Sequence, residues 1–164
     1  MMRVILDTNI YGELVKDPLA GKIIDVINPS IVLIYGIDII RKELRDTPKK
    51  DRLAQKNLRI ALLALYDRLV KDHTIKTSLM MRDLAEKYDL TYRELGGKKP
   101  RESLQPDFII VSCASLKGMD IIVTNDNATL ASELSQKAFR IVNMARNLRM
   151  PGFRDYEKFK RWLI

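Results

Sequence analysis

The chain has 164 residues, with 29 Lys and Arg against 21 Asp and Glu, which gives a formal net charge of +8. This length, with 46% hydrophobic residues, predicts a single globular domain over residues 1–164 and excludes a disordered chain. The single Cys and single His exclude an internal disulfide framework, a Cys-based zinc cluster and a multi-His metal site. Any catalysis would therefore depend on carboxylates, hydroxyls or amines.

Short apolar runs alternate with helical patterns in the first part of the chain. Residues 3–6 and 31–35 predict buried strands, because each is a short, continuous apolar run. Helices are expected over 10–16 and 19–27, which the pair Asp17-Pro18 separates, and over 37–46, with Asp38 as its cap. Leucines at helical spacing predict a long amphipathic helix over 51–71.

The second part of the chain continues the alternation. A helix over 78–95 is followed by a loop at 96–100, and a helix over 107–116 closes at Gly118. A strand over 119–123, a helix over 127–136, a strand over 139–142 and a basic helix over 153–163 complete the expected order. Short apolar strands between helices favour an α/β fold with a parallel sheet covered on both faces.

The first residues do not resemble a signal peptide, because the initial apolar run ends at Asp7. No window approaches the ~18 apolar residues that a membrane-spanning helix needs. We therefore expect a cytoplasmic protein with no membrane partner.

The positive charge is concentrated in two segments. Residues 41–59 hold eight basic and three acidic side chains, and residues 137–164 hold eight basic and two acidic ones. Clustered Lys and Arg suit phosphate contacts, although many such residues simply solvate helix surfaces. The residues expected to bind a nucleic acid through such contacts are Arg41, Lys42, Arg45, Lys49, Lys50, Arg154, Lys158 and Arg161.

Four acidic residues stand where buried elements end or turn. Asp7 and Asp126 each follow an apolar strand, Glu43 lies on the helix after the second strand, and Asp107 opens a later helix. Ligands in parallel sheets gather beyond the carboxyl ends of the strands, which is where these side chains would converge. Each acid also has a structural explanation: Asp7 and Asp126 as turn or capping residues, Asp107 as a first-turn acid, and Glu43 as a surface residue no better placed than Asp46.

Converging carboxylates need a counter-charge. Two of them about 4 Å apart repel by about 4 kcal/mol at an effective dielectric constant of about 20, so four cannot all stay ionised unaided. Oxygen ligands without His or Cys favour Mg²⁺ or Mn²⁺ over Zn²⁺. Small polar residues beside the acids are suited to orient the carboxylates or water, namely Thr8, Asn9, Thr124 and Asn125.

Taken together, Asp7-Thr8-Asn9, Glu43, Asp107 and Thr124-Asn125-Asp126 resemble the PIN domain family over residues 2–142. The resemblance implies a three-layer α/β/α sandwich with a short central parallel sheet, and a ribonuclease that depends on Mg²⁺ or Mn²⁺. It implies that Asp7, Glu43, Asp107 and Asp126 are the catalytic metal ligands, supported by the Thr124 hydroxyl. Many members are VapC-type toxins, which are commonly dimeric and pair with an antitoxin.

The chain departs from this family in two places. Many members carry a further acid two residues after the last aspartate, where this chain has Ala128, so the number of bound ions stays open. The basic helix expected over 153–163 extends beyond a minimal toxin.

The favoured hypothesis is an endoribonuclease that hydrolyses RNA phosphodiesters, either as a toxin or as an RNA-processing enzyme. The alternative is a catalytically weak or inactive PIN-like module that binds RNA or protein. A structure-specific DNA nuclease using the same acids is a third possibility, which the lack of room for a DNA-wrapping domain disfavours.

Overall fold

The computed structural model describes residues 1–28 and 30–164. Five parallel strands form the central sheet in the order β5-β2-β1-β6-β7. The strands are β1 (Met2–Leu6), β2 (Val32–Ile37), β5 (Thr74–Ile75), β6 (Ile121–Val123) and β7 (Gly152–Arg154). The chain moves outward from β1 in one direction and then returns to add β6 on the other side of β1. This reversal of strand order lies between β1 and β6, where α/β folds bind their ligands.

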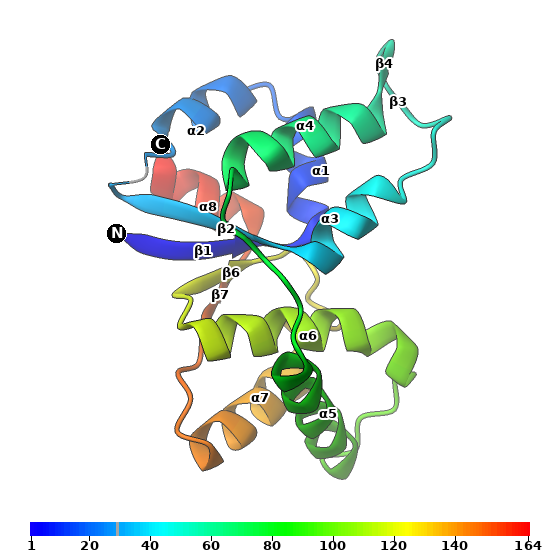
Figure 1. Cartoon of the computed structure of the whole chain (residues 1–164), viewed down its shortest axis with the longest axis vertical. Helices are drawn as coiled ribbons and strands as arrows, with labels where there is room; N and C mark the ends of the chain where they lie inside the picture. Colours follow the sequence, from blue (N-terminus) through cyan, green and yellow to red (C-terminus); the bar gives the residue numbers. More distant parts are fainter. Residues whose placement is uncertain (29) are drawn as a thin grey trace.

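Helices cover both faces of the sheet, as Figure 1 shows. One layer contains α1 (Thr8–Lys16), α2 (Ala20–Val26), α3 (Asp38–Arg45) and α4 (Leu58–Val70), with α8 (Tyr156–Leu163) packed beside α2. The other layer contains α5 (Leu79–Glu94), α6 (Arg101–Lys117) and α7 (Glu133–Ala145). The expected three-layer α/β/α sandwich with a short parallel sheet is confirmed.

The predicted elements of the first half and the helix α5 are found within two residues of their expected ends, except at 51–57. There the chain forms a two-stranded antiparallel hairpin, β3 (Arg52–Leu53) and β4 (Lys56–Asn57), so the helix expected over 51–71 begins only at Leu58. Asn57 caps that helix, because its side chain accepts a hydrogen bond from the Ile60 N–H. Asp38 is the first residue of α3 and not its cap, which is Ile37.

Several predictions for the second half are wrong. Residues 139–142 are helical and not a strand, because Phe139 and Val142 lie on the buried face of α7, which packs against α5. Residues 127–131 form turns, and α7 starts only at Glu133. The terminal helix expected over 153–163 starts at Tyr156, since residues 152–154 form β7 at the edge of the sheet.

Close packing holds the two layers onto the sheet. Gly36 in β2 leaves room for the Tyr66 side chain, whose hydroxyl oxygen would lie 1.9 Å from a Cβ atom at this position. Gly118 closes α6 in the left-handed conformation, with φ of 64°, as the sequence predicts. Within the described residues, no helix is long and apolar enough to cross a membrane.

Candidate active site

Asp7 lies at the carboxyl end of the central strand β1 and is 5% exposed. It is the N-cap of α1, since its Oδ1 accepts a hydrogen bond from the Thr8 N–H at 2.7 Å. Its other oxygen accepts hydrogen bonds from the Asn9 side chain at 2.8 Å and from the Thr124 hydroxyl at 2.7 Å. Asp7 is therefore both a helix cap and a carboxylate that the neighbouring strand holds in place.

Asp126 follows β6, the neighbour of β1. The Thr124 hydroxyl that binds Asp7 also accepts a hydrogen bond from the Asp126 N–H at 3.0 Å, so one side chain connects both carboxylates. Asn125 joins two further segments to this loop, because its N–H donates to the Asn9 side chain and its Oδ1 accepts from the Tyr156 N–H. Three of the four small polar residues predicted near the acids, Asn9, Thr124 and Asn125, form this network.

Asp107 comes from the opposite helical layer. It lies inside α6, six residues after the first, so the prediction that it opens a helix is wrong and the first-turn explanation falls with it. The Thr129 hydroxyl lies 2.8 Å from Asp107 Oδ2 and also within hydrogen-bonding distance of Asp126. Thr129 therefore links α6 to the loop after β6.

Glu43 projects from α3 toward the same edge. The Thr8 hydroxyl donates a hydrogen bond to its Oε2, which connects Glu43 to the residue after Asp7. Asp46, the alternative acid on this helix, is exposed and pairs with Lys42 at 3.5 Å. The structure thus places Glu43, and not Asp46, with the other acids.

The four carboxylates perturb one another. Burial raises the pKa of Asp107 to about 7, and the charges of Asp7, Asp126 and Glu43 add to the shift despite the opposing hydrogen bond from Thr129. Burial is also the main cause that raises the pKa of Asp7 and of Glu43. Burial acts on Asp126 in the same direction, but hydrogen bonds from Thr129 and from the Ala128 N–H outweigh it and lower the pKa of Asp126. The site is therefore a cluster of carboxylates in which burial and neighbouring charges bring the pKa of Asp107 close to neutral pH.

The four carboxylates are chemically suited to bind a hard divalent cation, but their side chains are not arranged as a complete coordination shell. None of the ion pairs found within residues 1–28 and 30–164 includes any of the four carboxylates. In the same part of the chain, no three Asp, Glu, His or Cys side chains are grouped closely enough to hold a metal ion together. Mg²⁺ commonly binds through one or two carboxylates and keeps several waters, so such a site does not need three direct ligands.

Three of the predicted RNA-binding residues line pockets next to the site, and the others do not. Lys42 lines a pocket together with Glu43, and Arg154 and Lys158 line another together with Thr124. Arg41 is held by Asp67 in a two-bond ion pair, with both distances 3.2 Å. The others are exposed, Arg45 at the end of α3, Lys49 and Lys50 in the loop after it, and Arg161 on α8.

Sequence reasoning missed two residues next to the acids. Thr129 lies three residues after Asp126, a spacing at which an aspartate commonly accepts a backbone hydrogen bond, and Asp126 does accept one from the Thr129 N–H at 2.9 Å. Lys99 donates to the Ala128 carbonyl, which places the loop at 96–100 against the loop that carries Asp126. The spacing could have indicated Thr129, whereas nothing in the sequence indicates the contact of Lys99.

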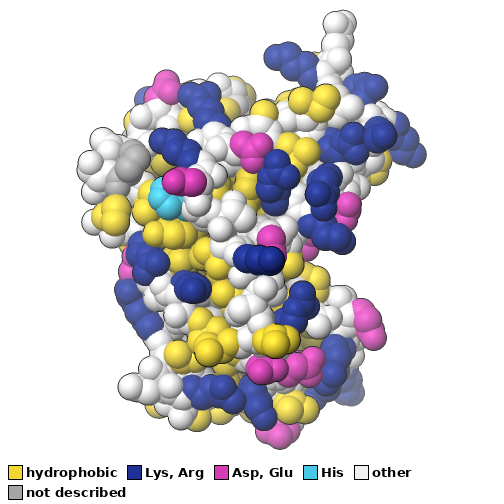
Figure 2. All heavy atoms as spheres, viewed as in Figure 1, with side chains coloured by type: hydrophobic (Ala, Val, Ile, Leu, Met, Phe, Trp, Pro, Cys, Tyr) yellow, Lys and Arg dark blue, Asp and Glu magenta, His cyan; other side chains and the backbone are white. Residues whose placement is uncertain are grey.

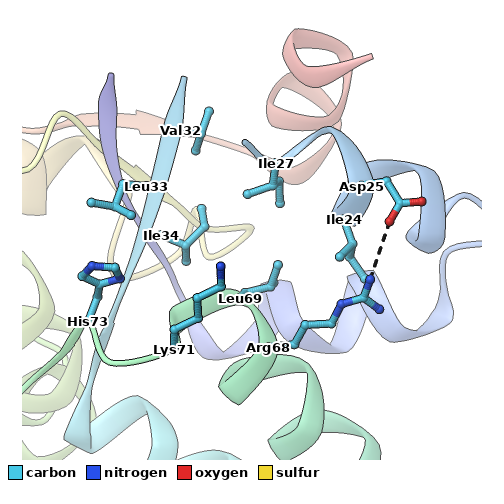
Figure 3. A pocket seen from close by; sticks show the side chains of 10 residues that line it. All are labelled: Ile24, Asp25, Ile27, Val32, Leu33, Ile34, Arg68, Leu69, Lys71 and His73. Atoms are coloured by element: carbon cyan, nitrogen blue, oxygen red, sulfur yellow. Dashed lines mark ion pairs between the residues drawn. The ribbon is translucent and has the colours of Figure 1, made fainter. Parts of the chain in front are cut away.

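Glu43 lines one hollow of the surface, and a second hollow lies elsewhere. Figure 2 shows the molecule narrowed between α3 and α6, with Lys and Arg side chains dense over α3 and the loop after it. The second hollow, of about 330 Å³, has an apolar floor at the start of β2, away from the carboxyl ends of the strands (Figure 3). Its rim carries the exposed pair of Arg68 and Asp25, 3.6 Å apart, and it includes none of the four acids.

Comparisons with known proteins find similarity in structure but not in sequence. No protein-family model matches the chain, and no curated protein matches it in sequence. A chain in the crystal structure of VapBC2 from Rickettsia felis, bound to a DNA fragment from their promoter, superimposes with a TM-score of 0.61 at 15% identity. The match covers 94% of this chain and 98% of that chain. At this identity the likeness establishes the fold alone, and it agrees with the PIN-like architecture that the sequence resemblance implies.

Proposed function

We propose that the protein is an endoribonuclease that depends on Mg²⁺ or Mn²⁺. The observation that carries the proposal is the convergence of Asp7, Glu43, Asp107 and Asp126 from four separate segments. The Thr124 and Thr129 hydroxyls connect Asp7, Asp126 and Asp107, and Thr8 connects Glu43 to Asp7 through its hydroxyl and its backbone N–H. Capping and surface roles account for single members of this set but not for their common location. The fold shared with a chain of the VapBC2 complex adds support at the level of fold.

The electrostatics of the pocket support a cation as the missing counter-charge. Burial and mutual repulsion hold the pKa of Asp107 near 7, so a cation that binds there gains from stabilising its ionised form. A divalent cation in such a site supplies a water molecule of lowered pKa and stabilises charge on the phosphodiester. Thr124 and Thr8 would hold Asp7 and Glu43 in place for it, and Thr129 would do the same for Asp107 and Asp126.

The surroundings of the acids favour a polyanionic strand, which is consistent with an RNA substrate. Lys42 lines a pocket with Glu43, and Arg154 and Lys158 line another with Thr124, so cationic side chains lie near the carboxylates. Phosphate groups of a strand that crosses the pocket would meet these side chains. Binding should therefore weaken as salt rises, whereas cleavage should also require the cation.

We further propose that the protein is the toxin of a toxin–antitoxin pair and that it is a homodimer. The support is the similarity of fold to a chain from VapBC2. A small gene next to this one that encodes a DNA-binding protein would favour the toxin over an RNA-processing enzyme. Sedimentation of the purified protein tests the dimer directly.

Cleavage of a mixed RNA pool tests the enzymatic proposal. We expect Mn²⁺ to support hydrolysis, EDTA to stop it, and Asp7→Asn to lower the rate by at least about 100-fold. The matched control is Asp72→Asn, since that side chain is 92% exposed and lies outside the site. A rate that Asp7→Asn leaves unchanged would refute the mechanism, and flap DNA cut in preference to RNA would refute the substrate.

A non-catalytic RNA-binding module is the second candidate. The observation that favours it is that no three acids group at metal-ligand distance within the described residues, together with Ala128 in place of a further acid. This candidate predicts RNA binding that is insensitive to Mn²⁺ and no hydrolysis of any RNA in the pool. The same assay therefore separates the two functions.

A further inference from the structure

A pocket of about 200 Å³ opens beside the acids, between α3, α5 and α6. Its floor is apolar and consists of Ile39, Pro106 and Ile109. Its rim is polar and consists of Lys42, Arg82 and Gln105, with Glu43 in the wall. Pockets for drug-sized ligands measure roughly 300–1,000 Å³, so this one suits a smaller flat group.

The pocket adjoins the proposed site of cleavage. Glu43 belongs to both, and Pro106 directly precedes Asp107. A group seated on the apolar floor would therefore hold its attached phosphate next to the carboxylates. Figure 2 shows the surface hollowed between α3 and α6, in the region where this pocket lies.

The lining matches the chemistry of an unpaired nucleotide. An apolar floor can accept the face of a base, and the Gln105 amide can both donate and accept hydrogen bonds at its edge. Arg82 is exposed and takes part in none of the ion pairs found in the described part of the chain, so its guanidinium is available to a phosphate. Among the described residues, the ion-pair partner of Lys42 is the exposed Asp46 at 3.5 Å, an interaction that a phosphate can replace.

A pocket of different chemistry lies at the loop after β6. It measures about 180 Å³ and is lined mainly by polar groups, among them Thr124, Gln136 and Arg154. Thr124 is the residue that holds Asp7 and Asp126, so this pocket also adjoins the carboxylates. An apolar pocket beside Glu43 and a polar pocket beside Thr124 would give a bound strand a preferred direction.

We propose that the pocket between α3, α5 and α6 binds the base of an unpaired RNA nucleotide next to the phosphodiester that is cleaved. Arg82 holds the phosphate of that nucleotide, and Gln105 determines which base is preferred. This inference rests on the proposed ribonuclease function. It adds that the substrate is single-stranded, because a base in a duplex is stacked and paired and cannot enter the pocket.

Binding measured without cleavage tests the inference. Fluorescence anisotropy in EDTA would follow labelled single-stranded 12-mers of A, C, G or U, and one duplex of the same length, on the full chain. Arg82→Ala should weaken single-strand binding by about tenfold, because a charge-assisted hydrogen bond is lost. Gln105→Ala should reduce the difference in Kd between the best and the worst homopolymer.

Matched variants control for charge and composition. Arg68→Ala removes the same charge from the exposed rim of the hollow at the start of β2 and should change Kd by less than twofold. Gln55→Ala removes an exposed amide in the turn between β3 and β4 and should keep the base preference. The replaced side chains are all exposed, so circular dichroism should show the wild-type fold for each variant.

The outcomes separate this inference from the proposed function. Unchanged binding by Arg82→Ala, an unchanged base preference in Gln105→Ala, or equal affinity for duplex and single strand would overturn the subsite even if Mn²⁺-dependent cleavage occurs. Base-selective binding that depends on both residues, without cleavage in Mn²⁺, would support the subsite and refute the nuclease. If the wild type binds no RNA in EDTA, the subsite is refuted, and the Mn²⁺-dependent cleavage assay alone decides the nuclease proposal.

Discussion

Asp107→Asn should remove a pH-dependent loss of stability. The pKa of Asp107 is raised from 3.8 to about 7 in the folded chain, chiefly by burial. Between these two values the folded state binds more protons than the unfolded state, so the free energy of unfolding falls as pH rises. The free energy of unfolding therefore falls between pH 5.5 and about pH 7, where Asp107 ionises. At 1.36 kcal/mol per pH unit, this decrease amounts to about 2 kcal/mol.

Urea unfolding in EDTA at pH 5.5 and at pH 8 measures this loss. The wild type should lose about 2 kcal/mol more than Asp107→Asn over this interval, since the amide keeps the Thr129 contact but cannot ionise. Glu102→Gln is the control, because it removes an exposed carboxylate from the same helix. Mg²⁺ at pH 8 should restore stability in the wild type more than in Asp107→Asn. The reasoning is refuted if Asp107→Asn and Glu102→Gln show the same change between the two pH values.

Three further substitutions, two of them with a control variant, test particular contacts. Thr124→Val should slow RNA cleavage by about 10- to 100-fold in a single-turnover assay, because Asp7 and the Asp126 N–H both lose a partner; a wild-type rate would contradict this. Gly36→Ala should lower the free energy of urea unfolding by about 1–3 kcal/mol through overlap with Tyr66, whereas Gly12→Ala, with nothing within 4 Å, should not lower it. Tyr11→Phe should leave the thermal midpoint equal or higher, because the Tyr11 hydroxyl is buried without a hydrogen-bond partner among the described residues. Tyr88→Phe should lower the midpoint, since its hydroxyl bonds to Asn143 at 2.6 Å.

The sequence predicted the elements whose structure follows from neighbouring residues along the chain. The strands β1 and β2 are continuous apolar runs buried in the middle of the sheet, and Gly118 ends α6 in a conformation that favours glycine. The ends of β1 and β6 also located Asp7 and Asp126, because parallel strands direct their carboxyl ends to one edge.

The wrong predictions concern segments whose secondary structure depends on tertiary contacts. Residues 139–142 are a short apolar run that fits a strand or a buried helix equally well, and packing of α7 against α5 selects the helix. The strand β7 has three residues and forms only because β6 offers it an edge. The sequence does not indicate the contact of Thr129 with Asp107, because the two residues are 22 positions apart. Only the placement of α6 brings Asp107 within 2.8 Å of the Thr129 hydroxyl.

Titration of the purified chain with Mn²⁺, followed by electron paramagnetic resonance at neutral pH, tests the central claim that the four acids hold a divalent cation. The account predicts saturable binding to the wild type and to Asp72→Asn, and binding at least about tenfold weaker in Asp7→Asn. Absence of saturable binding in the wild type, or equal binding by Asp7→Asn and Asp72→Asn, would contradict it.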